Sequence, residues 1–127
     1  LIMKFLLNSI GFFKPKLSRE EFDAYFNRLP DEIGVEWFRD GKFIIGNINI
    51  EGGTFMTQAI SADEFVDMVN DALLAIYEIP KEYFDALLAV KKFKPSREEF
   101  QALNNVAVKK SKASVSFKKE ELATANA

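Results

Sequence analysis

The sequence predicts a single α+β domain, in which a long helix packs on one face of a three-stranded antiparallel sheet. Three observations predict it: two alternating stretches that meet at Asp40-Gly41, a short alternating stretch after Gly52-Gly53, and a capped amphipathic stretch that begins at Ser61. We expect additional N-terminal and C-terminal helices around this unit. With 127 residues, 48% of them hydrophobic, the chain can form a core without metal ions or disulfides.

The N-terminal part of the chain contains an ambiguous segment and then a helix. Residues 1–13 are apolar and rich in Phe, and they fit either a strand or a short helix. Ser18 and Glu21 have the spacing of a capping box, in which each side chain accepts a hydrogen bond from the backbone of the other residue. A helix is therefore predicted from Ser18, and it ends before Pro30.

The Asp40-Gly41 pair predicts a tight hairpin, because both central residues of a type I′ turn take positive φ. In that register Arg39 faces Lys42 and Trp37 faces Ile44. One face of the ribbon is then entirely apolar, and we expect it to be buried. Its members are Ile33, Val35, Trp37, Ile44, Gly46, Ile48 and Ile50.

Four more elements are predicted after the hairpin. Residues 54–60 form the third strand, and the long helix runs from Ser61 to Ile79 with a Glu at the capping-box position. Residues 81–90 form a second, short helix. Ser96, again followed three residues later by Glu, begins a helix of two to three turns.

Charge is divided unevenly along the chain. Residues 1–90 hold 8 Lys or Arg against 15 Asp or Glu, whereas residues 91–127 hold 9 against 4. We therefore expect the domain to span residues 1–107 and a basic tail to span residues 108–127. The strand pattern at 113–117 makes this tail either an edge strand or a disordered segment.

The basic tail offers candidate nucleic-acid contacts. Arginine, the better reader of bases, is absent from it, so any binding should be weak, dependent on salt and tolerant of sequence. The alternative is a solvated tail without a nucleic-acid partner. The candidate contacts are Lys109, Lys110, Lys112, Lys118 and Lys119.

The second face of the ribbon carries Phe38, Phe43 and Ile45 near the turn. If exposed, these side chains form a candidate surface for a protein partner. The alternative is that another part of the chain covers them, either the helix that begins at Ser18 or the segment from Phe5 to Phe13.

Composition argues against an enzyme. The chain has no Cys and no His, which removes thiol chemistry and the commonest general base and metal ligand. The carboxylates of Asp63, Glu64, Asp67 and Asp71 have the spacing of a solvated helix face, so we expect no metal and no cofactor. The Gly52-Gly53 pair lacks the residues that would make a phosphate-binding loop.

We expect a cytoplasmic protein, since cysteine is absent and no apolar run is long enough to span a membrane. The longest candidate, Phe5 to Phe13, is interrupted by polar residues. Lys14-Pro15-Lys16 follows without a small-residue cleavage site, so the N-terminus is expected to be structural. Met3 has the character of a start residue, which leaves open whether Leu1 and Ile2 are native.

The segments Asp40–Gly46, Thr57–Glu64 and Asn70–Leu73 resemble the HicB-like antitoxin family, over about 47 residues between Ile33 and Ile79. The resemblance implies a partial ribonuclease-H-like domain without catalytic carboxylates. It also implies a partner, a small ribonuclease toxin of the HicA type that the protein binds and neutralises, and a C-terminal DNA-binding unit. The alternative function is a structural or adaptor protein that uses the same scaffold for self-association as a homo-oligomer or for another partner.

Overall fold

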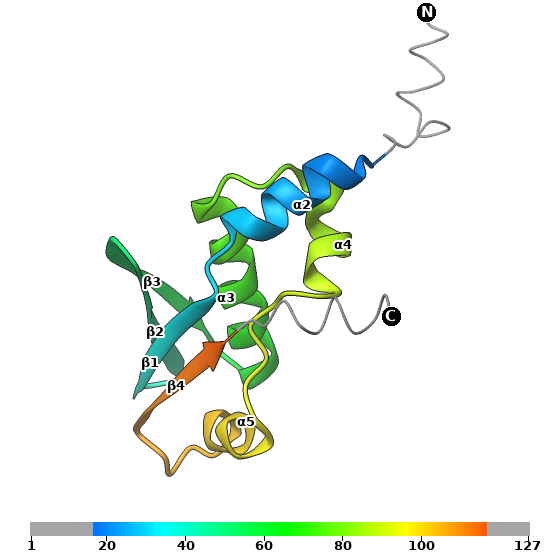
Figure 1. Cartoon of the computed structure of the whole chain (residues 1–127). Helices are drawn as coiled ribbons and strands as arrows, with labels where there is room; N and C mark the ends of the chain where they lie inside the picture. Colours follow the sequence, from blue (N-terminus) through cyan, green and yellow to red (C-terminus); the bar gives the residue numbers. More distant parts are fainter. Residues whose placement is uncertain (1–16, 117–127) are drawn as a thin grey trace, which may run out of the picture.

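A computed structural model describes residues 17–116 of the chain, and the side chains of residues 17–111. Figure 1 shows a sheet on one side of α3, with α2 and α4 near one end of α3 and α5 near the other. The elements are α2 (Arg19–Arg28), β1 (Glu32–Asp40), β2 (Phe43–Ile50), β3 (Gly53–Ala59), α3 (Ala62–Ile76), the 3₁₀ turn η1 (Lys81–Tyr83), α4 (Phe84–Leu88), α5 (Arg97–Asn104) and β4 (Lys110–Ser116).

The sheet has four antiparallel strands in the order β3-β2-β1-β4, so the three predicted strands are confirmed but the predicted sheet lacks one strand. The α+β class and the additional helices are confirmed. The fourth strand is β4, which pairs with β1 from Phe38↔Lys110 to Glu32↔Ser116. The local pattern did indicate a strand here. It carried no information about a partner strand that lies far earlier in the chain.

The hairpin between β1 and β2 turns at Gly41-Lys42, one residue later than predicted. Asp40 pairs with Phe43 and Trp37 pairs with Gly46, so the predicted register is shifted by two residues along the partner strand. Gly41 has φ of 62°, and it is the only positive-φ residue of this turn. Glycine at the first central position fits a type II′ turn, in which the second position accepts a residue such as Lys. Because the shift is even, each side chain keeps its predicted face.

The predicted apolar face of the hairpin is the core of the domain. Six of its seven members are buried, and Ile50 is half-buried. The long helix α3 packs onto this face with a stripe of buried apolar side chains, Phe65, Val69 and Leu73. Phe93 and Leu103, from the segment that leads to β4, complete the same cluster.

Gly46 lies directly beneath the ring of Phe65. A Cβ atom at this position would lie 2.6 Å from Cε1 of Phe65 and 3.1 Å from Cγ2 of Thr57. Real Cβ atoms do not approach a ring carbon so closely, so a side chain here must push α3 away from the sheet. The glycine is therefore required by the close approach of α3 to β2.

We expect Gly46→Ala to lower the free energy of unfolding by about 1 to 3 kcal/mol, the usual cost of overpacking a core. Chemical denaturation measures this loss. Gly34→Ala is the matched control, because its Cβ would meet nothing closer than 3.8 Å. A Gly46→Ala protein as stable as the Gly34→Ala protein would show that α3 shifts without cost.

A second apolar cluster lies at the end of α3. Phe26 and Leu29 of the α2 region pack there against Leu74 of α3 and Leu87 of α4. The α2 helix therefore packs against other helices. The predicted alternative, in which α2 covers the second face of the sheet, is wrong. The apolar stripe of α2 finds its complement in Tyr83, Leu87 and their neighbours rather than in the sheet.

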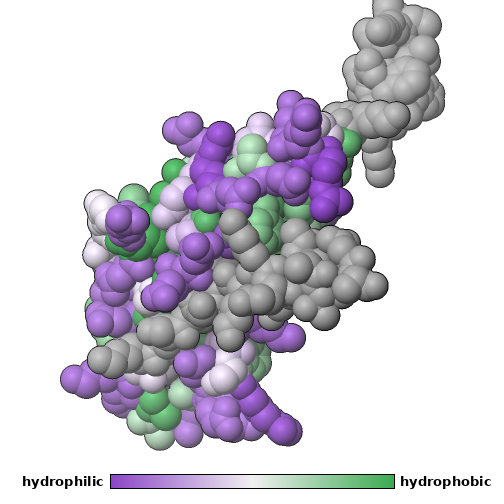
Figure 2. Space-filling model, in the orientation of Figure 1, coloured by the Kyte–Doolittle hydropathy of each residue, from purple (hydrophilic) through white to green (hydrophobic). Residues whose placement is uncertain are grey.

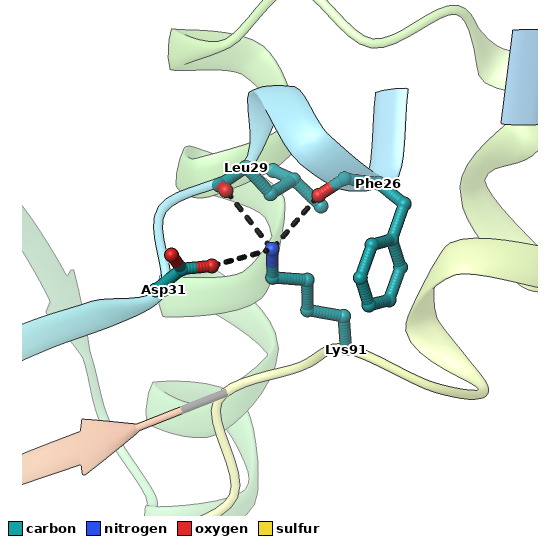
Figure 3. Close-up of polar contacts among 4 residues, drawn as sticks. All are labelled: Phe26, Leu29, Asp31 and Lys91. Carbon is teal, nitrogen blue, oxygen red and sulfur yellow. Dashed lines mark hydrogen bonds and ion pairs between the residues drawn. The ribbon is translucent and has the colours of Figure 1, made fainter. Parts of the chain in front are cut away.

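A buried lysine fastens the end of α2 to the segment after α4 (Figure 3). The Nζ atom of Lys91 donates to the carbonyl oxygens of Phe26 at 2.8 Å and Leu29 at 3.0 Å. It also lies 3.5 Å from Oδ1 of Asp31 and 4.4 Å from the centre of the Phe26 ring. These carbonyls belong to the last turn of α2, where no amide of the helix is available to them. A cation at this end also complements the helix dipole.

Only one of the three predicted capping boxes is complete, the one at Ser96 and Glu99. At Ser61 the hydroxyl accepts from the N–H of Glu64, but the Glu64 carboxylate accepts from the N–H of Ile60. All three helices begin where predicted. Whether the Glu carboxylate also accepts a hydrogen bond from the N–H of the N-cap serine depends on the local path of the chain.

The box at Ser18 is completed through a third residue. The Ser18 hydroxyl accepts from the N–H of Glu21, as predicted. The Ser18 N–H, however, donates to the Tyr83 hydroxyl, which in turn donates to the Glu21 carboxylate at 2.7 Å. Tyr83 thus enters the capping arrangement and joins the start of α2 to η1.

Candidate protein-binding face of the sheet

The sheet face opposite α3 carries the predicted partner surface. Phe38 of β1 pairs with Ile45 of β2, and Phe43 lies two positions from Ile45 on the same face. Phe38 is 42% exposed, and Phe43 and Ile45 are half-buried. Met56 of β3 joins this face through its pairing with Asn47, and its side chain is 69% exposed. The structure thus brings the three candidate residues together and adds a methionine that sequence reasoning missed.

No helix among the described residues covers this face. The helices α2 and α4 pack in the second cluster, and α3 and α5 pack with the first. The segment from Phe5 to Phe13, the other predicted cover, lies outside the described residues. Within residues 17–116, an apolar patch is therefore exposed on the sheet, which is the character of a protein-binding surface.

One of the candidate lysines borders the apolar patch. Lys110 is exposed and pairs with Phe38 across the sheet, and Lys112 pairs through its Cα atom with Glu36. Beside Phe38 is a hollow of about 500 Å³, whose lining includes Glu36 and Lys110. A partner on this face would therefore meet an aromatic ring together with an acidic and a basic residue.

The other candidate lysines are placed differently. Lys109 is exposed just before β4, and its Nζ atom donates to the carbonyl oxygen of Val106 at 3.1 Å. Lys118 and Lys119 lie outside the described residues. Of the five predicted nucleic-acid contacts, the structure thus brings Lys110 to the face that carries Phe38.

Arg39 positions this edge of the sheet, and sequence reasoning treated it only as a residue next to the turn. Its Nε atom donates to the carbonyl oxygen of Val108 at 3.0 Å, and Nη2 donates to that of Leu103 at 2.9 Å. Its guanidinium also lies 5.3 Å from the centre of the Trp37 ring. Arg39 therefore ties the end of α5 and the entry to β4 to the core strand, which places Lys110 beside Phe38. A single arginine beside a turn gives no sequence signal of this role.

A separate groove of about 940 Å³ runs between α3 and the segment 92–101. Asp63, Asp67 and Asp71 line it from α3, and Lys92, Lys94 and Arg97 line it from the other segment.

Figure 2 shows that hydrophilic side chains dominate this view of the molecule, with a dense group over α2.

The polar residue buried in this groove is already satisfied. Asn70 donates to the carbonyl oxygen of Phe93 at 3.1 Å and accepts from the Phe93 N–H at 2.7 Å. Its amide therefore fixes the chain after α4 against α3, leaving the exposed charges of the groove in contact with solvent. Among the described residues, no group of three or more Asp, Glu, His or Cys could hold a metal ion.

Two tyrosines have raised pKa values, and both are explained by local contacts. The hydrogen bond to Glu21 is the main cause that raises the pKa of Tyr83, and burial raises the pKa of Tyr77 with a smaller contribution from Glu51. An ordinary tyrosine is already protonated at neutral pH, so the rise in pKa does not change the protonation state of either phenol there. Neither residue belongs to the exposed sheet face.

The described helices, within residues 17–116, all lack the length and apolar character needed to cross a bilayer. No family model matches this chain, and neither a curated protein nor a solved structure does.

Proposed function

We propose that this protein is a HicB-like antitoxin, a cytoplasmic binding protein without catalytic activity that neutralises a small ribonuclease toxin of the HicA type. The toxin would be held on the sheet face that carries Phe38, Phe43 and Ile45. The single observation that carries the proposal is the exposure of Phe38 on this apolar face. Large aromatic side chains of this kind are the usual anchors of protein interfaces.

The shape of the resembling segment supports the same proposal. Ile33 to Ile79 contains β1, β2, β3 and α3, which pack as three antiparallel strands under one helix. In this arrangement α3 covers one face of the sheet. None of the described helices covers the other face, so that face stays available to a partner protein.

The composition of the chain is consistent with an inhibitor rather than a nuclease. A ribonuclease of the HicA type depends on a catalytic His, and this chain has none. Lys109, Lys110 and Lys112 add positive charge near β4, and we propose that they provide at most weak DNA contact. Such contact should weaken steeply as salt is added.

The test uses a small, basic, His-containing protein encoded by a neighbouring reading frame. Co-expression and co-purification with the full chain should yield a complex, and the complex should lack the ribonuclease activity of the free toxin. Titration calorimetry should then show that Phe38→Ala weakens binding by about thirtyfold, the effect of losing an interface anchor.

Val106→Ala is the matched control, because Val106 is 72% exposed but lies in the turn after α5. It should bind as the unchanged protein does. Equal binding by both variants would exclude the Phe38 face as the toxin site. If no neighbouring frame encodes such a protein, the adaptor function replaces the antitoxin function.

A further inference from the structure

Among residues 17–116, the strand β3 forms an edge of the sheet that no other strand covers. Among the described strands it pairs only with β2, so its other side presents free backbone groups. Its seven residues, Gly53–Ala59, include no charged residue and no proline. Phe55 and Met56 are exposed at 39% and 69%, on opposite faces of the strand. A strand edge of this kind is a template for pairing with another strand.

The opposite edge of the sheet has the usual protection. The strand β4 contains Lys110 and Lys112, and charged residues at an edge discourage pairing with another chain. Two β4 strands placed side by side would bring lysines of both copies together. The lysines of β4 therefore disfavour strand pairing at that edge of the sheet, whereas the uncharged strand β3 does not.

Symmetry selects the occupant of the β3 edge. Pairing of β3 with β4 of another copy would leave free edges at both ends and would extend into filaments. Pairing of β3 with β3 closes after two copies, because an antiparallel pair of identical strands has a two-fold axis. An uncharged strand is also complementary to itself, since no like charges meet across the axis.

We propose that two copies of this chain form a homodimer by antiparallel pairing of their β3 strands, which joins the two sheets into one of eight strands. Met56 is the middle residue of β3, so the two Met56 side chains lie opposite one another at the axis. The two copies then present their Phe38 faces on the same side of the joined sheet. This dimer does not rest on the proposed antitoxin function, although Met56 also lies on the sheet face proposed to hold the toxin.

Sedimentation velocity and size-exclusion chromatography with light scattering test the dimer on the full chain. The unchanged protein should have twice the monomer mass of 14.5 kDa at micromolar concentrations. Met56→Lys and Met56→Glu should each raise the dissociation constant of the dimer at least about tenfold, because each places like charges at the axis. Mixing the two variants should restore a dimer, since Lys then lies opposite Glu.

Val106→Lys is the matched control for added charge, and it should leave the dimer intact. The proposal is overturned if the unchanged protein is a monomer throughout the micromolar range, or if Met56→Lys dimerises as the unchanged protein does. A dimer that Phe38→Lys abolishes and Met56→Lys does not would also overturn it, because the contact would then be the sheet face. Toxin binding is measured separately, so loss of the dimer leaves the antitoxin proposal standing.

Discussion

Replacing Trp37 with alanine should lower the free energy of unfolding by about 3 to 5 kcal/mol, the usual cost of deleting a buried aromatic side chain. Trp37 is 4% exposed, and it lies in the core cluster between the sheet and α3. Its ring also contacts the Arg39 guanidinium, which holds the end of α5. The substitution therefore leaves a cavity and loosens the attachment of β4. Chemical denaturation monitored by circular dichroism measures the loss.

Phe38→Ala is the matched comparison, because Phe38 is the next residue of the same strand and points to the opposite face. With 42% of its surface exposed, it should cost no more than about 1 kcal/mol. A large and equal loss in both variants would mean that the second face is also buried. That result would remove the structural basis of the proposed partner site.

Replacing Lys91 with alanine should destabilise the protein by about 3 kcal/mol. Lys91 is 3% exposed, and its ammonium group binds the carbonyl oxygens of Phe26 and Leu29. Without this ammonium group, both buried carbonyl oxygens lose their hydrogen-bond donor. Each unsatisfied buried group lowers the free energy of unfolding by about 1 to 3 kcal/mol. The hydrocarbon stem that packs beside the Phe26 ring is lost as well. Thermal and chemical denaturation measure the change.

Lys91→Met separates the two contributions, since methionine keeps most of the hydrocarbon volume and supplies no donor. We expect Lys91→Met to retain more than half of the alanine variant's loss. The carboxylate of Asp31 is 73% exposed and 3.5 Å away, so solvent screens it and Asp31→Asn should change stability little. A Lys91→Met protein as stable as the unchanged one would show that the hydrogen bonds of the ammonium group only balance the cost of burying that group.

Local patterns in the sequence were enough to predict most of the elements. Alternation placed the buried face of β1 and β2 correctly, and the Ser-to-Glu spacings placed the starts of α2, α3 and α5. The turn type was wrong because an Asp-Gly pair fits a type I′ turn, whereas Gly41 alone takes positive φ here. Local sequence therefore specified the face of each side chain, while the register depended on a choice between two tight turns.

Long-range contacts were beyond sequence reasoning. Lys91 lies in a run of charged and apolar residues, and nothing in that run indicates that its ammonium binds the end of α2, some 60 residues earlier. The partner of β4 and the contacts of Arg39 are of the same kind. For the candidate site, Phe38, Phe43 and Ile45 could be grouped from the hairpin alone. Met56 and Lys110 join them only through pairing with β2 and β1.

The position of β4 has a consequence for how the chain is synthesised. β1 ends at Asp40 and its outer neighbour begins at Lys110, so the ribosome must add about 70 residues before the neighbour exists. At 5 to 20 residues per second this takes roughly 4 to 14 s, whereas a hairpin such as β1-β2 forms within microseconds. During that delay β1 has no neighbour on the flank that β4 covers in the complete sheet. An unpaired strand edge of this kind favours association between incomplete chains.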